Sequence, residues 1–406
     1  MKHQFFFISL LAIITLGCDD DNQNNTNLPF EDPVYTDSID FTGPDRIYYT
    51  ITGPTWEDDN LQVNETVFAM GEGSIDPETG LVVPEISHLA AYCSDATAYL
   101  SFYPVWKGEE TIPEGSYTLS GKLIDPLTQE SSPFFSVSGD LAVTNGQYLP
   151  IEVTAAQLPP LTAKLHILEI THEYTVNQST YTQVTRMELA QVWKCPLPGT
   201  PLYEKIIRWG CEWIDGHIED EGQISENVIA DTLLTSMVAL EPLGYRYGPF
   251  PRPSNFDDRA EVFLDFKQSA CGEFRGFFMA LVETQGIDAN WLWFWFNQPS
   301  STEYSMYQTI ELPALGTSSV VWRYSDHIVV QVNGIVYDPT YLLIKENPDE
   351  YEDYIFASFC LGEDEPCYGA NSWCTIPDGP QGECIDNPPG YTEGVSPPRF
   401  TGEDYR

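Results

Sequence analysis

The chain contains few basic side chains for its length. Its 406 residues include 18 Lys and Arg against 61 Asp and Glu, which gives a formal net charge of −43 at pH 7. An acidic surface of this kind repels the phosphates of nucleic acids and the headgroups of anionic lipids. We therefore exclude nucleic acid as a partner, and we exclude membrane contact through a basic surface.

The chain also lacks an apolar run long enough to span a bilayer. Residues 5–16 are largely apolar, follow Lys2 and lead to Gly17 and Cys18, an order typical of a secretory signal peptide. Gly17-Cys18 with acidic residues after it resembles a bacterial lipoprotein signal, in which Cys18 becomes the lipid-carrying first residue. We expect a protein anchored by lipid to a membrane of the cell envelope, periplasmic or at the cell surface. Export without lipidation of Cys18 is the alternative.

Cysteines at the close spacings of structural zinc sites are missing, as are the alternating oxygen ligands of a calcium loop. We therefore expect no metal and no cofactor. Because an exported chain meets oxidising conditions, its nine cysteines favour disulfides. Two bridges, with three connectivities open, are expected among the cysteines of the Gly-, Pro- and Asn-rich tail: Cys360, Cys367, Cys374 and Cys384. Cys195 and Cys211 form a further candidate bridge, which leaves Cys93 as the candidate for the unpaired cysteine.

Residues 41–195 lack any cluster of His, Cys and carboxylates that indicates chemistry. Their histidines, His88, His166 and His172, are scattered, so we interpret them as packing or surface residues. Short runs rich in β-branched and aromatic residues recur between Gly, Pro and Asn over residues 41–195. This spacing predicts an all-β sandwich whose role is spacing or binding.

Residues 269–286 (SACGEFRGFFMALVETQG) have the pattern of an amphipathic helix that ends at Gly286. The apolar side chains of one helical face are Phe274, Phe277, Phe278, Leu281 and Val282. Cys271 stands at the N-terminus of this helix, where the aligned peptide dipoles favour a thiolate, the nucleophilic form. The alternative is that Cys271 is a small buried apolar residue.

Residues 326–340 (DHIVVQVNGIVYDPT) have the pattern of a β-hairpin. Asn333-Gly334 is a strong two-residue turn signal between two β-branched runs, and it fixes the register of the strands. In this register Asp338 is the diagonal neighbour of His327 on the same face of the sheet, so a hydrogen bond between carboxylate and imidazole is feasible. Such a pair can orient a base for a thiol nucleophile. An ordinary hairpin with a surface His is the alternative.

Together, Cys271 at a helix start, His327 in a strand and Asp338-Pro339-Thr340 resemble the transglutaminase-like superfamily. The resemblance covers residues 201–343. It implies a papain-like α+β fold with Cys271 as nucleophile, His327 as general base and acid, and Asp338 as the residue that orients the imidazole. The chain departs from the family pattern at Arg275, where a small residue is common, at Asp288 in place of Pro, and at Val329 in place of an aromatic residue.

Three further elements of this module follow from the sequence. Thr200-Pro201 predicts a helix start, followed by the apolar stripe Ile206, Trp209 and Trp213. Ser225 is expected to cap a second helix. Residues 291–296 (WLWFWF) are apolar on both faces, which predicts a central strand covered on each side.

The predicted fold class is α+β: an N-terminal all-β sandwich, a papain-like transglutaminase-type α+β domain and a Cys-rich irregular tail. The predicted units are a signal peptide (1–18), a flexible tether (19–40), the sandwich (41–198), the transglutaminase-like domain (199–345) and the disulfide-rich tail (346–406). We expect an envelope-anchored thiol enzyme that acts on amide bonds of protein or peptide substrates, with hydrolysis favoured over transfer to an amine. The alternative is a catalytically inactive module that binds partners at the surface.

Overall fold

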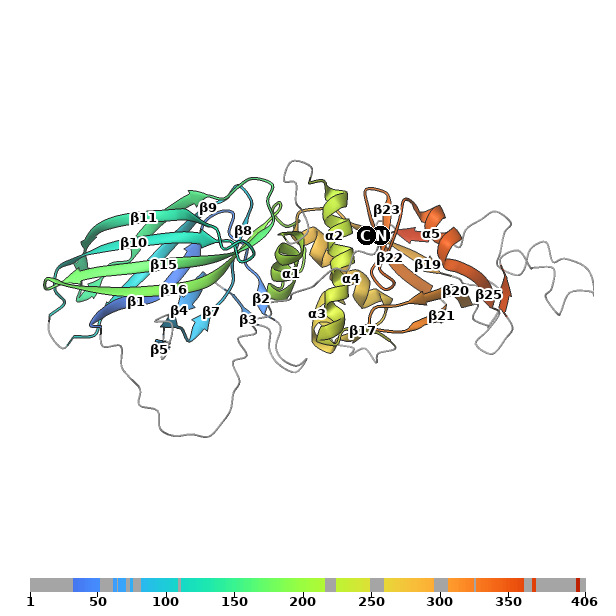
Figure 1. Cartoon of the computed structure of the whole chain (residues 1–406), viewed down its shortest axis with the longest axis horizontal. Coiled ribbons are helices and arrows are strands. Elements are labelled where there is room, and N and C mark those ends of the chain that lie inside the picture. The colour runs from blue at the N-terminus through green and yellow to red at the C-terminus, as the bar shows by residue number, and fades with distance from the viewer. Residues whose placement is uncertain are drawn as a thin grey trace, which may run out of the picture.

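The computed structural model describes most of the chain between residues 32 and 401. The described ranges are 32–51, 61–63, 65–70, 74–75, 82–108, 111–215, 224–248, 259–295, 306–324, 326–360, 367–369 and 399–401. Over these ranges the protein is an elongated α+β molecule. Sheets form one end, most of the helices lie in the middle, and further sheets with a short helix form the other end (Figure 1).

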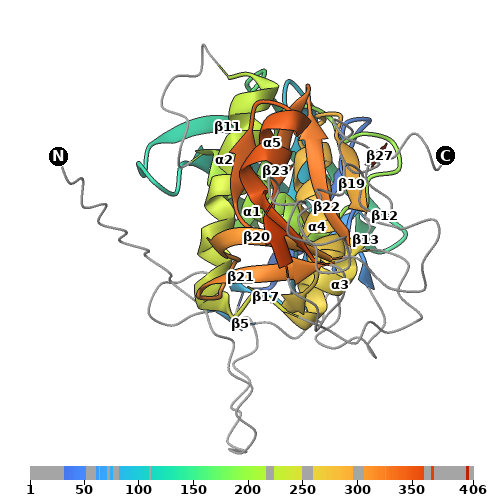
Figure 2. The same ribbon diagram turned by 90° about the vertical axis from the view of Figure 1, so that its right-hand side faces the viewer.

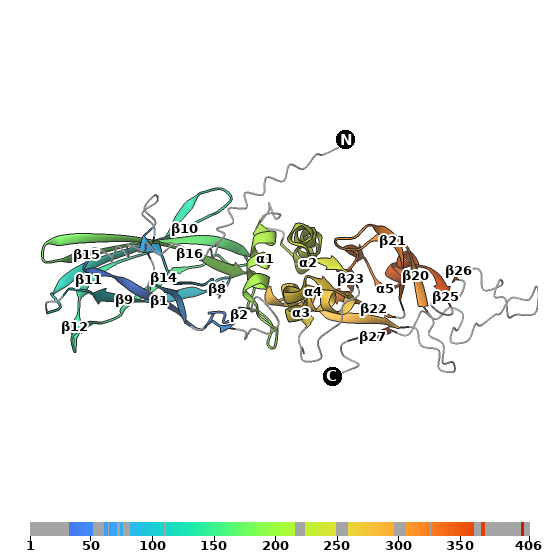
Figure 3. The ribbon, with the colours of Figure 1, turned by 90° about the horizontal axis from the view of Figure 1, so that it is seen from below.

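Two five-stranded sheets pack face to face at the N-terminal end, and Figure 3 shows the two layers from the side. Several of their longer strands alternate buried and more exposed residues, so each of these strands buries one face. Phe102 and Leu168 come from different sheets and are both fully buried in the shared core. Across the first sheet the order is β14 (Ile151–Gln157), β9 (Thr97–Trp106), β1 (Val34–Thr42), β4 (Thr66–Ala69) and β7 (Ile86–Ser87). Across the second it is β11 (Ser131–Leu141), β10 (Gly115–Ile124), β15 (Lys164–Val176), β16 (Ser179–Val192) and β8 (Ala90–Cys93).

Three short strand pairs lie beside these sheets. They are β2 (Thr50–Ile51) with β3 (Leu61–Gln62), β5 (Ser74–Ile75) with β6 (Val82–Val83), and β12 (Val143–Thr144) with β13 (Gln147–Tyr148).

The N-terminal boundary predicted for the sheets is wrong by several residues. Strand β1 begins at Val34, so residues 34–40 belong to a sheet and not to a tether. Ile39 and Phe41 are fully buried between the sheets. The reason is that these apolar side chains recur at every second position, and this periodicity outweighs the surrounding Asp and Ser.

Most of the helices lie in the middle of the molecule. Helix α2 begins as predicted, because the Ser225 side chain accepts a hydrogen bond from the Val228 N–H at 3.3 Å. Helix α1 begins at Glu204, later than Thr200-Pro201 indicates, although Ile206 and Trp213 are buried as expected. The bounds are α1 (Glu204–Asp215), α2 (Glu226–Ser236), the 3₁₀ helix η2 (Met237–Leu243), α3 (Arg259–Phe266) and α4 (Cys271–Thr284).

A third five-stranded sheet carries the predicted hairpin. Val332 pairs with Ile335 and Val330 with Tyr337, as the turn at Asn333-Gly334 predicts. Strand β19, from the apolar run at 291–296, lies between two neighbours, which confirms it as an inner strand. The order is β24 (Leu343–Lys345), β23 (Ile335–Asp338), β22 (Asp326–Val332), β19 (Asn290–Trp295) and β27 (Arg399–Thr401).

Both faces of this sheet are covered. Val330 and Val332 pack in the core that contains the apolar face of α4. Val329 and Leu292 pack in another core with Tyr351 and Ile355 of helix α5 (Pro348–Ile355). Figure 2 looks onto this end, where α5 lies beside β23. The core therefore extends past residue 345, the predicted end of the domain, because α5 supplies apolar side chains to it.

The remaining described strands form one four-stranded sheet and one parallel pair. A four-stranded sheet has the order β21 (Ser319–Tyr324), β20 (Met306–Pro313), β25 (Phe356–Cys360) and β26 (Cys367–Gly369). A parallel pair, β17 (Arg246–Tyr247) and β18 (Gln268–Ser269), lies just before α4.

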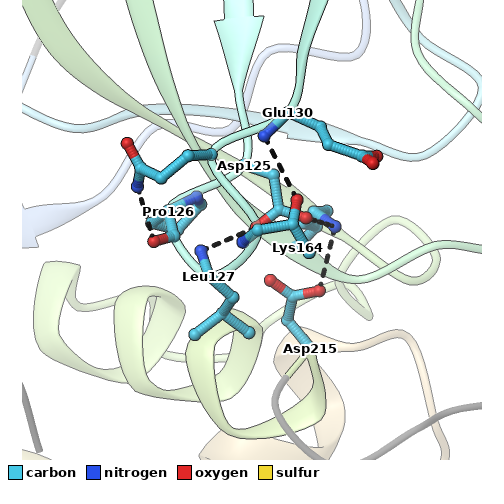
Figure 4. Close-up of polar contacts among 8 residues, drawn as sticks. Asp125, Pro126, Leu127, Glu130, Lys164 and Asp215 are labelled. Atoms are coloured by element: carbon cyan, nitrogen blue, oxygen red, sulfur yellow. Dashed lines mark hydrogen bonds and ion pairs between the residues drawn. The ribbon is translucent and has the colours of Figure 1, made fainter.

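The N-terminal sheets and the helices meet at helix α1. Lys164, at the start of β15, contacts Asp125 at 2.7 Å and Asp215, the last residue of α1, at 3.2 Å (Figure 4). In the same contact region, called the seam below, the Gln285 side chain at the end of α4 accepts a hydrogen bond from the Trp193 N–H at 2.9 Å. Polar contacts thus tie the sheets to both α1 and α4.

The disulfide prediction for this seam is wrong. Cys195 pairs with Cys93, not with Cys211. Cys211 is a free, buried thiol whose Sγ donates to the Gln191 carbonyl at 3.2 Å. The sequence did not show that β8 and β16 are parallel neighbours, which brings Cys93 opposite Val192 and close to Cys195. No described helix is both apolar enough and long enough to cross a membrane.

Candidate active site

Cys271 is held at the N-terminus of a firmly packed helix. It is the first residue of α4, is half-buried, and is a free thiol. The Glu273 carboxylate accepts a hydrogen bond from the Ala270 N–H at 3.1 Å, which fixes the first turn. Phe274, Phe277 and Phe278 are fully buried, so the helix cannot rotate without exposing apolar surface. The position of the sulfur is therefore set by the core beneath it.

His327 lies in strand β22 and is almost completely buried. Its Nε2 atom is 2.9 Å from Oδ2 of Asp338, in the hydrogen bond that the hairpin register predicts. The same imidazole is also hydrogen-bonded to the Cys271 side chain. The ring of Tyr341 lies against it, with 5.4 Å between the ring centroids. The structure thus brings Cys271, His327 and Asp338 together in one continuous chain of contacts.

The surroundings of His327 favour its protonated form. Burial alone would lower its pKa, but the charge and hydrogen bond of Asp338 and the contact with Cys271 raise the pKa to about 10. An imidazolium beside a thiol stabilises the thiolate. The arrangement can therefore supply both a nucleophile and a proton donor.

Asp338 accepts four hydrogen bonds. Its Oδ1 atom accepts from the backbone N–H groups of Thr340 at 2.9 Å and Tyr341 at 3.4 Å. Its Oδ2 atom accepts from His327 and from the Tyr351 hydroxyl, the latter at 2.5 Å. A buried carboxylate needs partners of this kind to remain charged. The sequence Asp338-Pro339-Thr340 thus forms a turn that holds its own first residue.

Tyr351 is the residue of this site that the sequence analysis missed. The acidic run at 349–353 is typical of a solvated surface, yet Tyr351 within it is fully buried. A signal was present: Asn347 caps α5 by accepting from the Glu350 N–H at 2.9 Å, and Pro348 is the first helical residue. Asn-Pro followed by Glu is a typical helix start.

The departures from the family pattern have their own partners. The Arg275 guanidinium lies over the Trp291 ring at 5.4 Å, and its Nε atom is 3.5 Å from the Gly272 carbonyl oxygen. Val329 is fully buried in the core beneath α5. Asp288 stands between Ile287 and Ala289, which are buried. None of these positions removes a member of the Cys-His-Asp arrangement.

The remaining candidate residues are only partly described. Cys360 and Cys367 are register partners in β25 and β26, whereas Cys18, Cys374 and Cys384 lie outside the described residues. Burial raises the pKa of the Cys211 thiol to about 12, so this second free cysteine is unreactive.

The histidines of the N-terminal sheets have structural roles where they are buried. His172 is hydrogen-bonded through Nδ1 to the Thr36 hydroxyl at 2.8 Å and through Nε2 to the Thr185 hydroxyl at 3.0 Å. Burial lowers its pKa to about 3, so it stays neutral. This agrees with its interpretation as a packing residue.

Comparison with known proteins does not place the chain in a family. No family model matches it, and no curated protein matches it. Among solved structures it is similar to a candidate protease from Parabacteroides distasonis, with 7% identity and a TM-score of 0.17. The match covers 61% of this chain and 65% of that one, less than two thirds of the other protein. A TM-score this low supports no conclusion on fold or activity.

Proposed function

We propose that the protein is a thiol enzyme of transglutaminase-like type that acts on amide bonds of protein or peptide substrates. The observation that supports this most directly is the chain of contacts from Cys271 through His327 to Asp338. A nucleophile, a base and a residue that orients the base are the parts that covalent acyl chemistry requires.

In this proposal the reaction has two steps. The Cys271 thiolate attacks the amide carbonyl carbon, the C–N bond breaks, and the proton on His327 passes to the leaving amine. A thioester remains on Cys271. His327 then takes a proton from water, the hydroxide attacks the thioester, and the carboxylic acid leaves as Cys271 is restored. Asp338 holds the imidazole and stabilises its positive charge throughout.

The oxyanion formed in both steps needs donors. Cys271 is the first residue of α4, and the first N–H groups of a helix have no acceptor within the helix. The Cys271 N–H is therefore the proposed donor to the developing charge. Removal of one such donor typically costs about 3 kcal/mol of transition-state stabilisation.

We propose water as the acyl acceptor and the cell envelope as the place of action. The place of action is supported by the signal-like residues before Cys18, which would anchor the enzyme by lipid. Transfer to an amine uses the same three residues. A trial with a peptide library and added alkylamine separates the two reactions, because hydrolysis gives new carboxyl termini and transfer gives alkylamide products.

The proposal is tested by labelling with a thiol-reactive peptide-amide mimic. We expect wild type to be labelled at Cys271, Cys271→Ala to lose this label, and His327→Ala to react at least about tenfold more slowly, since one pKa unit is a factor of ten in thiolate. Cys211→Ala removes the other described free thiol and is the matched control, with wild-type labelling expected. Equal labelling of wild type and His327→Ala would instead support the inactive binding module.

A further inference from the structure

Tyr351 contacts the candidate triad from outside the hairpin that carries His327 and Asp338. It comes from α5, which packs on the face of the sheet that also presents Val329. Its hydroxyl donates to Asp338 Oδ2 at 2.5 Å, on the same oxygen atom that is bound to His327 Nε2. Its ring stacks on Phe294 at 5.3 Å, so the ring position is fixed without the hydroxyl.

We infer that Tyr351 is a positioning residue that sets how strongly Asp338 holds the proton on His327. The inference rests on the proposed function and extends it to α5. Two donors share Oδ2, and a charge-assisted hydrogen bond from a tyrosine draws negative charge away from the oxygen that faces the imidazole. Removal of the hydroxyl leaves that charge to His327 alone.

The result is an imidazolium tuned between two needs. It must be stable enough to keep its positive charge beside the Cys271 sulfur, and acidic enough to give its proton to a leaving amine. Tyr351 weakens the attraction of Asp338 for the proton on His327 and so favours transfer of this proton to the leaving amine. The backbone N–H groups of Thr340 and Tyr341 act on the other oxygen, Oδ1, and do not compete with His327 directly.

Other charged or titratable groups around the pair are few among the described residues. From β22 the group is His327, and from α4 it is Cys271, through its hydrogen bond to His327. From the turn after β23 it is Tyr341, whose pKa is raised by burial and by the charge of Asp338. From α5 it is Tyr351. Tyr351→Phe leaves the side chains of His327, Cys271 and Tyr341 in place and removes only the hydroxyl that donates to Asp338.

The test is the pH dependence of Cys271 alkylation by iodoacetamide in the full chain. Because the ring and its stacking on Phe294 are kept, Tyr351→Phe is expected to fold with a near-native unfolding temperature. We expect the low-pH limb of its rate profile to move down by about 0.5 to 1 pH unit. A shift of this size corresponds to part of the free energy of one charged hydrogen bond. On that limb the variant would react about three- to tenfold faster than wild type.

The control is Tyr354→Phe in the same helix. Tyr354 is 40% exposed and lies beneath the Lys345 ammonium, so loss of its hydroxyl is expected to leave the profile unchanged. Incorporation of 3,5-difluorotyrosine at position 351 makes the hydroxyl a stronger donor and is expected to move the limb upward. This second variant decides the question even if Tyr351→Phe folds poorly.

Two failures are distinguishable. If wild-type Cys271 reacts with the profile of an ordinary thiol, the proposed function fails and the role of Tyr351 fails with it. If wild type has a displaced profile and both Tyr351 variants coincide with it, the thiol enzyme stands and Tyr351 is only a packing residue.

Discussion

Asp338 is the residue on which the site depends most. It is a fully buried carboxylate whose two oxygen atoms each accept two hydrogen bonds. Its charge is the main reason that the pKa of His327 is raised despite burial. Because Asn has nearly the same shape, replacement of this one side chain separates charge from packing.

We expect Asp338→Asn to slow alkylation of Cys271 at pH 6 by at least about tenfold, since loss of the carboxylate lowers the pKa of His327 and so removes the positive charge beside the sulfur. The measurement is the iodoacetamide rate with mass mapping of Cys271. Asp231→Asn is the control: Asp231 accepts from the Tyr337 hydroxyl at 2.9 Å, away from His327. Equal rates in Asp338→Asn and wild type would show that the carboxylate does not act on the imidazole.

The His327–Asp338 contact could be predicted from the sequence because a two-residue turn fixes the register of both strands. Asn333 and Gly334 adopt φ values of 50° and 87°, which this turn type requires. Tyr351 could not be predicted in the same way, since its contact depends on how α5 docks. Nor could the bridge between Cys93 and Cys195, which depends on parallel pairing of β8 with β16.

At the scale of elements, α5 is short and depends on its N-terminal cap. Asn347 Oδ1 accepts from the Glu350 N–H at 2.9 Å, and the Glu350 carboxylate accepts from the Glu346 N–H at 3.0 Å. A helix of eight residues has little stability of its own, so this cap and the burial of Tyr351 and Ile355 hold it in place.

We expect Asn347→Ala to lower the free energy of unfolding by about 1 kcal/mol, the usual contribution of an N-cap side chain. Asn347→Asp keeps the acceptor and is expected to retain wild-type stability. Urea unfolding followed by circular dichroism measures both variants. An Asn347→Ala midpoint equal to that of Asn347→Asp would show that α5 is held by its apolar contacts alone.

The elements with strong local patterns were predicted well, and those set by distant packing were not. Helix α4 begins at Cys271 and is followed by Gly286 with a φ of 73°, as its stripe and its glycine indicate. Strand β1 was missed because its polar residues resemble a tether, although Ile39 and Phe41 alternate correctly.

At the scale of the whole molecule, the N-terminal sheets and the candidate site are mechanically linked through α4. Cys271 is at one end of this helix, and Gln285 at the other end accepts from the Trp193 N–H in the segment that leaves β16. Gly286 packs so closely on this segment that a Cβ atom there would lie 2.6 Å from the Cys195 carbonyl oxygen. The seam therefore fixes the base of the helix whose tip carries the thiol.

The ion pairs of Lys164 make the outer part of this seam sensitive to acid (Figure 4). Partial burial would raise the pKa of Asp125, but hydrogen bonds from Lys164, Thr128 and Leu127 lower it to about 2. A carboxyl group whose pKa is lowered by folding stabilises the native state above its unfolded pKa, near 3.8, and this contribution is lost as the pH falls through about 2.

We therefore expect Asp125→Asn to be less stable than wild type at pH 6, by about 1 kcal/mol or less because the pair is partly exposed to solvent. The difference should shrink between pH 4 and pH 2, where wild type loses the same interaction. Thermal unfolding across this pH range measures it, with the exposed Asp140 of β11 replaced in Asp140→Asn as the control. A difference that stays constant from pH 6 to pH 2 would mean that Asp125 acts through the shape of its turn and not through its charge, so the seam would be held by its buried contacts alone.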